Sequence, residues 1–186
     1  MGKVILGVTI SMDGFAEDSN GNVGALYPDL DTLRNTEVLR ESIHTTGSVV
    51  MAWKEFAMAK DPDSIADNYE YQVPIFVFTD KAPKKHPKET DRLTFTFVTD
   101  GIKSAVWQAK AAACDKNVTI IGSASTTGQC IRAGLADELH IDIIPVFLKG
   151  GFRPFEDTGN KSIKVERIKV VELPAGRTHL KFRIIK

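Results

Sequence analysis

Residues 118–156 read VTIIGSASTTGQCIRAGLADELHIDIIPVFLKGGFRPFE, and this segment carries a complete pattern of strand, helix and strand. Its first four residues are β-branched and predict a buried strand. The residues after Gly122 predict a helix that begins at Ser123 or Ser125, because serine is a favoured N-cap. The alternation of apolar and polar residues over 139–144 predicts a second strand. Such a crossover unit predicts two parallel neighbours, with ligands bound beyond the strand ends.

The turn between this first strand and the helix predicts an anion-binding site. Backbone N–H groups at the start of a helix have no partner within the helix, and they lie at the positive end of its dipole. The small residues of the Gly122–Ser125 turn therefore predict a backbone cradle for a phosphate. Met51–Lys54, where another predicted strand leads into a short helix, is a second candidate cradle.

The rest of the chain predicts one α/β domain that spans residues 1–186. Its length is typical of a single domain, and no linker long enough to divide it is present. Periodicity predicts strands at 3–10, 47–51, 74–79 and 93–98, helices at 30–43, 52–56 and 101–112, and a closing hairpin of 163–173 and 177–185.

Composition excludes several classes of function. The 24 basic and 24 acidic residues give a net charge of zero, which argues against binding to nucleic acid or to a membrane surface by bulk attraction. The two cysteines are far apart, and no spacing of His, Cys, Asp and Glu is typical of a metal site, so we predict no metal. The apolar start is too short to span a membrane and is not followed by a cleavage site. We therefore expect a cytoplasmic protein.

Several of these motifs resemble the dihydrofolate reductase-like superfamily. They are the Gly122-Ser123 turn, Gly134-Leu135-Ala136-Asp137-Glu138-Leu139, Pro145-Val146, Gly150-Gly151 with Pro154-Phe155, and Ser11-Met12-Asp13-Gly14 after the first strand. The branch that they resemble is the reductase domain of riboflavin biosynthesis and its stand-alone relatives. The resemblance implies a three-layer fold whose central sheet is mostly parallel, flanked by helices, and ends in a C-terminal antiparallel hairpin.

The resemblance also implies NADPH as the cofactor. The matching positions of this chain are Ala52, Trp53, Lys54, Thr79, Gly122, Ser123, Ala124, Ser125, Gly150 and Gly151. Ala52 and Trp53 depart from the family, which has Gly-Arg there, and Ser123 stands where a second glycine is common. The alanine adds a methyl group at a close approach, and the loss of arginine removes a bidentate phosphate ligand. Trp53 has two interpretations, stacking on an adenine or packing with Phe56.

The resemblance places the reactive end of the cofactor near Asp13, which is the first candidate for a catalytic carboxylate. Asp31 and Asp29 are the next candidates, while Ser11 shapes the pocket and Arg153 could bind a substrate phosphate. An Asp-Gly pair after a strand is also a common turn, and Arg153 could equally be a solvated surface residue.

Two functions remain open from the sequence. The first is an NADPH-dependent reductase that passes hydride to a small heterocyclic or imine-bearing substrate, such as a ribosylaminopyrimidine or a pterin. The second is a nucleotide-binding or interaction module that keeps the scaffold without turnover, which the Ala52-Trp53 departure favours. The resemblance also implies a homodimer.

Overall fold

The computed structural model describes residues 2–59, 61–159 and 162–185. The contacts between residues divide the chain into two compact units. The first unit contains residues 1–4 and 43–121, and the second contains residues 5–42 and 122–186. The assignment of residues 1–186 to one domain stays a prediction, and each unit is described by itself.

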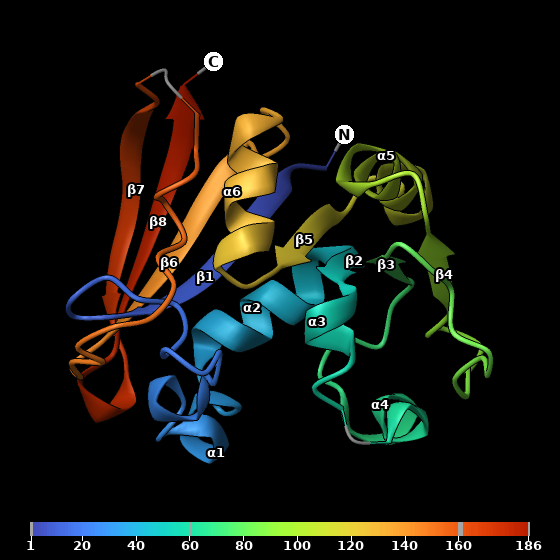
Figure 1. Cartoon of the computed structure of the whole chain (residues 1–186), viewed down its shortest axis with the longest axis horizontal. Coiled ribbons are helices and arrows are strands. Elements are labelled where there is room, and N and C mark those ends of the chain that lie inside the picture. Colours follow the sequence, from blue (N-terminus) through green and yellow to red (C-terminus); the bar gives the residue numbers. More distant parts are fainter. Residues whose placement is uncertain (1, 60, 160–161, 186) are drawn as a thin grey trace. The chain divides into compact units, whose positions relative to one another are not determined.

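The first unit is built on four parallel strands in the order β4-β3-β2-β5. They are β2 (Thr46–Ala52), β3 (Ile75–Phe78), β4 (Phe95–Val98) and β5 (Asn117–Ile121). All four residues of β3 are buried, as expected for a strand that is covered on both faces. The helix α5 (Ile102–Ala113) packs on these strands through its buried apolar residues (Figure 1). The shorter elements are α3 (Trp53–Phe56), the 3₁₀ turn Pro62–Ser64 and α4 (Ile65–Asn68).

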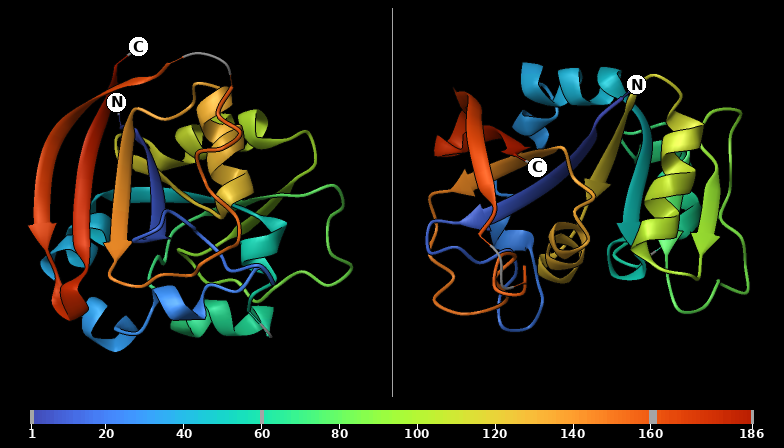
Figure 2. Two further views of the ribbon diagram at one scale, coloured as in Figure 1. Left: turned by 60° about the vertical axis from the view of Figure 1, so that its left-hand side comes forward. Right: turned by 90° about the horizontal axis from the view of Figure 1, so that it is seen from above.

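The second unit contains the other strands. They are β1 (Val4–Ser11), which is parallel to β6 (Glu138–Ile144), and the hairpin of β7 (Lys164–Glu172) and β8 (Thr178–Ile185), whose strand β8 is antiparallel to β6. The helix α6 (Ala124–Arg132) covers one face of these strands, and α1 (Leu30–Leu33) and the start of α2 (Glu37–Thr45) lie on the other face (Figure 2). Short 3₁₀ turns occupy Gly24–Leu26 and Pro174–Gly176. The predicted fold class is confirmed: a mixed, mostly parallel sheet flanked by helices, with a C-terminal antiparallel hairpin.

The prediction that the two strands of the 118–144 segment are direct neighbours is wrong. The strand β5 pairs with β2, whereas β6 pairs with β1 and β8. A crossover helix makes two strands parallel, but it does not require them to be adjacent. The place beside β6 is taken by β1, whose apolar residues are mostly buried.

The single helix predicted at residues 30–43 is also wrong, because the chain forms α1 and α2 with a break between them. The Thr36 hydroxyl donates to the Leu33 carbonyl and accepts from the Leu39 N–H, at 2.8 and 3.3 Å. It therefore ends one helix and caps the next. Helix α6, which starts at the predicted position, ends before Leu135, because Gly134 adopts a φ of 64° and terminates it.

The strand β7 is the outer strand of the hairpin, at one end of the strand order. Its residues are exposed except for the half-buried Val171, and it has a bulge between Arg167 and Lys169. Exposed Val165, Ile168 and Val170 alternate here with charged residues. Across the described ranges, no helix is both long enough and apolar enough to cross a membrane.

Candidate functional site

Most of the predicted site residues of the second unit lie in two loops and at one helix end. The N-terminal loop (residues 12–22) follows β1, and the glycine loop (residues 145–155) follows β6. The helix end is the first turn of α6. Several hydrogen bonds join the two loops, among them the bond from the Met12 N–H to the Val146 carbonyl at 2.9 Å.

Asp13 lies in the N-terminal loop, and three donors hold its carboxylate. The Ser11 hydroxyl donates at 2.6 Å, and the backbone N–H groups of Leu148 and Lys149 donate at 3.1 and 2.9 Å. These hydrogen bonds, that from Ser11 first, hold the pKa of Asp13 below its usual value. An aspartate with a lowered pKa is ionised at neutral pH and is a poor proton donor. Because two of the three donors belong to the glycine loop, the Asp13 carboxylate holds that loop in position.

Ser11 and Arg153 lie beside Asp13. The Ser11 hydroxyl accepts a hydrogen bond from the Phe15 N–H at 3.0 Å, so it serves the turn itself. Arg153 donates through Nη1 to the Asp13 carbonyl at 2.8 Å, and its guanidinium lies 4.0 Å from the centre of the Phe15 ring. The Arg153 side chain is still 42% exposed. The structure therefore brings Ser11, Asp13 and Arg153 together and leaves the Arg153 guanidinium partly exposed at the surface.

The glycines of the glycine loop are required by the contact between the two loops. Gly151 has a φ of 137°, and a Cβ there would lie 1.9 Å from the Glu17 carbonyl oxygen. Phe152 donates to this carbonyl at 3.1 Å and accepts from the Ala16 N–H at 2.9 Å, which forms a short antiparallel bridge. A Cβ at Gly150 would have its nearest neighbour at 3.2 Å. Close packing of this chain on itself therefore accounts for Gly151.

The first turn of α6 holds a carboxylate of the chain itself. Ser123 is the N-cap residue, but its side chain makes no capping hydrogen bond. Instead, Oε1 of Glu17 accepts a hydrogen bond from the Ala124 N–H at 3.2 Å, and Glu17 is only 1% exposed. Ser125, the alternative cap, is exposed within the first turn. An anion therefore occupies the position that the sequence predicts for a phosphate.

Gly122 is required by the packing of α6. A Cβ at this position would lie 2.4 Å from Cβ and Cγ2 of Thr126, one turn further along. A larger residue at Gly122 would therefore disturb the helix whether or not a ligand binds. Substitution at this position cannot test the cradle by itself.

The predicted cofactor residues of the first unit surround the start of α3. The Ala52 N–H donates to Oε2 of Glu55 at 3.0 Å, which is the local arrangement of a capping box. The Trp53 ring packs against Phe56 and Phe97, with ring centres 5.3 and 6.3 Å away, and Trp53 is 39% exposed. Trp53 thus packs with Phe56, and its exposed part leaves stacking on a base as a further prediction.

Lys54 and Thr79 complete the predicted set in the first unit. Lys54 is exposed in α3, and the Thr79 hydroxyl donates to the Lys81 carbonyl at 3.0 Å. The predicted cofactor residues are therefore divided between the units. The first unit holds Ala52, Trp53, Lys54 and Thr79, and the second holds Gly122, Ser123, Ala124, Ser125, Gly150 and Gly151.

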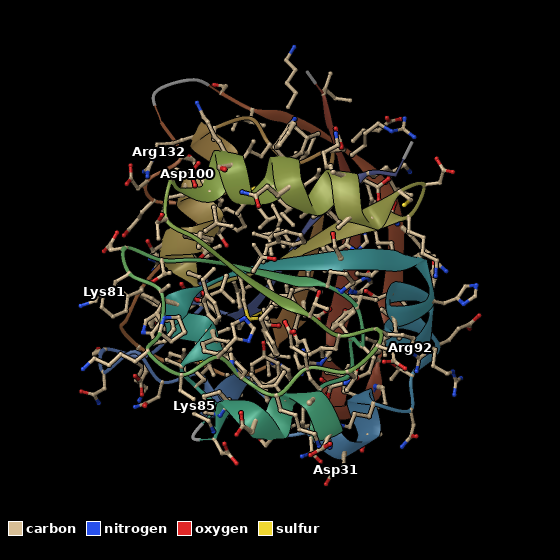
Figure 3. The ribbon with its side chains drawn as sticks, turned by 90° about the vertical axis from the view of Figure 1, so that its right-hand side faces the viewer. Asp31, Lys81, Lys85, Arg92, Asp100 and Arg132 are labelled. Carbon is tan, nitrogen blue, oxygen red and sulfur yellow. The ribbon has the colours of Figure 1, made fainter. Side chains whose placement is uncertain are left out.

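Asp31 and Asp29 lie in different environments. Asp31 is exposed in the first turn of α1, at the surface of the molecule (Figure 3). Asp29 is buried and binds Arg177 through both carboxylate oxygens, at 2.6 and 3.0 Å. Hydrogen bonds from Arg177 hold the pKa of Asp29 below its usual value, so it is ionised and structural rather than a proton donor. Among the described residues, no group of three or more His, Cys, Asp and Glu side chains could hold a metal ion.

Comparison with known proteins identifies the family. The model of the RibD C-terminal domain matches residues 2–178. The chain belongs to this family. No curated protein sequence matches it.

Three solved structures illustrate what this chain is similar to. A protein assigned to riboflavin biosynthesis in Shewanella sp. PV-4 has a TM-score of 0.75 at 19% identity, with 99% of both chains covered. RibD of Acinetobacter baumannii has a TM-score of 0.70 at 14% identity, with 100% of this chain and 58% of that chain covered. Dihydrofolate reductase of Enterococcus faecalis, complexed with NADP(H), has a TM-score of 0.67 at 12% identity, covering 100% and 98%. At these identities the likeness shows the fold.

The fit of a dinucleotide phosphate to this RibD C-terminal domain can be tested at α6. The Ala124 N–H already binds a carboxylate, so this helix end accepts an anion. The Glu17 carboxylate stands in for the phosphate that the resemblance implies. The donor set therefore fits the anion chemistry, with Glu17 as an occupant from within the chain.

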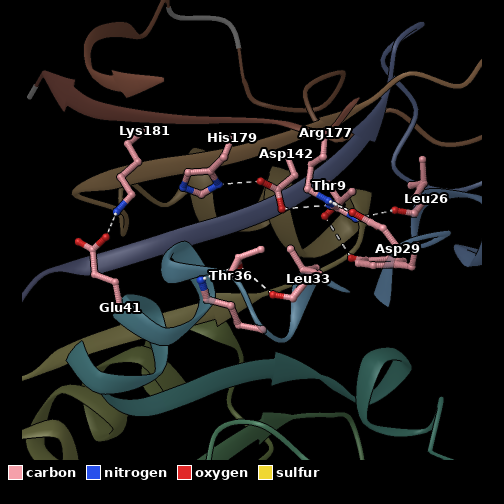
Figure 4. Close-up of polar contacts among 12 residues, drawn as sticks. Thr9, Leu26, Asp29, Leu33, Thr36, Glu41, Asp142, Arg177, His179 and Lys181 are labelled. Atoms are coloured by element: carbon pink, nitrogen blue, oxygen red, sulfur yellow. Dashed lines mark hydrogen bonds and ion pairs between the residues drawn. The ribbon is translucent and has the colours of Figure 1, made fainter. Parts of the chain in front are cut away.

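A buried network of charged residues surrounds Arg177 and was not predicted from the sequence (Figure 4). The Arg177 side chain is 0% exposed and binds Asp29, Nη1 donates to Asp142 at 3.2 Å, and Nη2 donates to the Leu26 carbonyl at 3.2 Å. Asp142 also binds Nδ1 of His179 at 2.6 Å. This network connects the turn before α1 with β6 and β8.

A signal for this network is present in the sequence. Arg177, His179 and Lys181 have the period-two spacing of one strand face, as do His140 and Asp142. Antiparallel pairing of β6 with β8 brings Asp142 opposite His179 and His140 opposite Lys181. Two polar strand faces that pair in this register could have indicated a buried polar cluster.

Proposed function

We propose that this chain is a reductase that uses NADPH to reduce a small heterocyclic or imine-bearing substrate. Membership of the RibD C-terminal domain family supports the reductase class. The observation that carries the cofactor proposal is the anion held at the start of α6. Bound NADPH would supply the hydride, so the chain itself needs no nucleophile.

The residues that would bind the dinucleotide lie at two helix starts. In the second unit, the N–H groups that follow Ser123 would take the diphosphate, with the Ser125 hydroxyl at the surface of the same turn. In the first unit, Lys54 would supply a positive charge near the start of α3, and the exposed part of Trp53 would stack on the adenine. These roles are proposed from the resemblance, separately for the residues of each unit.

The residues that would act on the substrate lie in the two loops. Asp13 is the predicted catalytic carboxylate, and the hydrogen bonds that it accepts from the N–H groups of Leu148 and Lys149 also give it a positioning role for the glycine loop. The half-exposed guanidinium of Arg153 would bind a substrate phosphate, which is consistent with a phosphorylated ribosylaminopyrimidine. Asp31, the remaining predicted carboxylate, lies outside these loops and is exposed in the first turn of α1. A pterin-like substrate would have no phosphate for Arg153.

The second candidate is a nucleotide-binding module of the same fold without turnover. The loss of the Gly-Arg pair at Ala52 and Trp53 favours it. An enzyme oxidises NADPH when a suitable acceptor is added. A module without turnover binds NADPH to saturation and does not oxidise it. We also propose that the protein is cytoplasmic and forms a homodimer. Light scattering of the purified protein would check the homodimer.

The test is a titration of the full chain with NADPH and NADH, followed through quenching of the fluorescence of Trp53 and Trp107. We expect saturable quenching by NADPH, and then loss of absorbance at the nicotinamide band when an aminopyrimidine or dihydropterin acceptor is added. Saturation without turnover would favour the binding module. Absence of quenching by either dinucleotide at millimolar concentration would overturn both candidates.

A further inference from the structure

Glu17 is an unusual occupant of a helix end. It lies 107 positions before its partner Ala124 in the sequence, and it is almost completely buried. The carboxylate of Glu55 at α3 differs, because it caps its own helix three residues away in the common capping-box arrangement. Glu17 is therefore brought to α6 by tertiary structure and not by a local turn.

The backbone of Glu17 has little freedom to leave this position. The glycine loop holds it through the bond from Phe152 to its carbonyl, and the neighbouring Ala16 N–H donates to the Phe152 carbonyl. Gly151 lies so close to the Glu17 carbonyl that no side chain fits between them. The loop is therefore anchored on its glycine-loop side. The rotatable bonds of the Glu17 side chain are the remaining way to vacate the first turn of α6.

A carboxylate and a diphosphate cannot occupy the same helix end. Both are anions that need the same N–H donors, and like charges at van der Waals distance repel strongly where water is excluded. Burial removes most of the water that would screen Glu17. Binding of a dinucleotide at α6 therefore requires that Glu17 give up its hydrogen bond to Ala124.

We propose that Glu17 is a built-in competitor for the dinucleotide diphosphate at the start of α6, so that its side chain must rotate away before the cofactor binds. This inference rests on the proposed function and deepens it. The side chain sets the affinity for the cofactor and acts as a gate, while the two loops stay joined. An interaction of a carboxylate with a helix amino end corresponds to roughly a tenfold change in an equilibrium constant.

The experiment compares dissociation constants for NADPH in the full-length protein and three variants. Glu17→Gln removes the charge and keeps the shape, and Glu17→Ala empties the position. The matched control is Glu172→Gln, which changes the net charge equally at an exposed residue of β7. Fluorescence quenching gives the dissociation constant, and competition with inorganic pyrophosphate tests whether the diphosphate is the part recognised. Circular dichroism at 222 nm and thermal unfolding confirm that each variant is folded.

We expect Glu17→Gln and Glu17→Ala to bind NADPH about tenfold more tightly than the native chain and the control, and pyrophosphate to compete more strongly in both. If native and Glu17 variants bind NADPH equally, or the variants bind it more weakly, the inference is overturned while the proposed function stands. If none of the folded proteins binds NADPH, both are overturned.

Discussion

Replacement of Arg177 by methionine should be among the most destabilising single changes in the second unit. Methionine fills much of the space, but it leaves the buried Asp29 carboxylate without its bidentate partner and removes the donors to Asp142 and to the Leu26 carbonyl. Loss of one partner of a buried ion pair costs about 3–5 kcal/mol, because an uncompensated charge stays in the interior. For a chain of this size, the midpoint of thermal unfolding should fall by about 6–20 °C.

The assay is urea and thermal unfolding followed by circular dichroism. The matched control is Arg183→Met in the strand β8, which begins directly after Arg177, because Arg183 pairs with Glu166 at 3.0 Å and both side chains are more than half exposed. That surface pair should contribute less than about 1 kcal/mol. A loss at Arg177 that is no larger than the loss at Arg183 would refute the assignment of a buried, energetically coupled network.

The same network predicts how the free energy of unfolding depends on pH in the acid range. The pKa of Asp29 is lower in the folded chain than in the unfolded chain, because Arg177 donates hydrogen bonds to its carboxylate. Its contribution to stability is therefore complete above the unfolded pKa of about 3.9 and is lost as the pH falls towards the lowered value. In Arg177→Met this part of the acid dependence should disappear.

In addition to the prediction for Glu17, three further predictions concern Asp13 and Gly151 in the two loops and His140 in β6. Asp13→Asn should lower the thermal midpoint and speed hydrogen exchange in the glycine loop, because an amide cannot accept from all three donors; an unchanged exchange pattern would contradict this. Gly151→Ala should cost about 2 kcal/mol or more, measured by urea unfolding, whereas Gly24→Ala, with no atom within 4 Å of the added carbon, should be nearly neutral. Burial holds the pKa of His140 below its usual value, so the unfolded chain binds the proton first and stability should decrease as the pH falls below about 6.5; His140→Gln should flatten that slope in unfolding measured from pH 5 to 8.

The sequence predicted the elements whose own residues determine them. The four buried residues of β3 and the apolar face of α5 follow from local periodicity, and both elements form near the expected residues. The fold class could also be predicted, because the motifs from Gly122 to Phe155 and after β1 occur in the order of the family. These features depend on residues that are close in the sequence, or on short motifs that can be recognised without knowing which distant residues they contact.

The features that were missed depend on distant partners. A helical pattern over 30–43 gives no warning that Thr36 caps a second helix. The β5–α6–β6 pattern does not show that β1 takes the place beside β6. The occupant of the predicted anion site was missed for the same reason, because Glu17 lies in a polar loop 107 residues before Ala124 in the sequence.

The predicted site residues divide in a similar way. The resemblance assigned Asp13, Ser11 and Arg153 to the substrate end of the site, and the structure brings them together. The three donors to the Asp13 carboxylate follow from the fold of the loops and not from the sequence pattern. Asp29 and Asp31 are two residues apart, yet one is buried against Arg177 and the other is exposed. Sequence spacing could not distinguish them, because the cation that binds Asp29 is Arg177, which lies 148 residues away, just before β8.

The outer strand β7 has a consequence for how the protein behaves at high concentration. A long, flat, apolar strand at the end of a sheet is a template for amyloid-like stacking of one molecule on the next. Here Lys164, Glu166 and Arg167 interrupt the apolar residues, and the bulge before Lys169 twists the free edge. The charges and the bulge together make fibril growth from this edge unfavourable, although nearly the whole strand faces water.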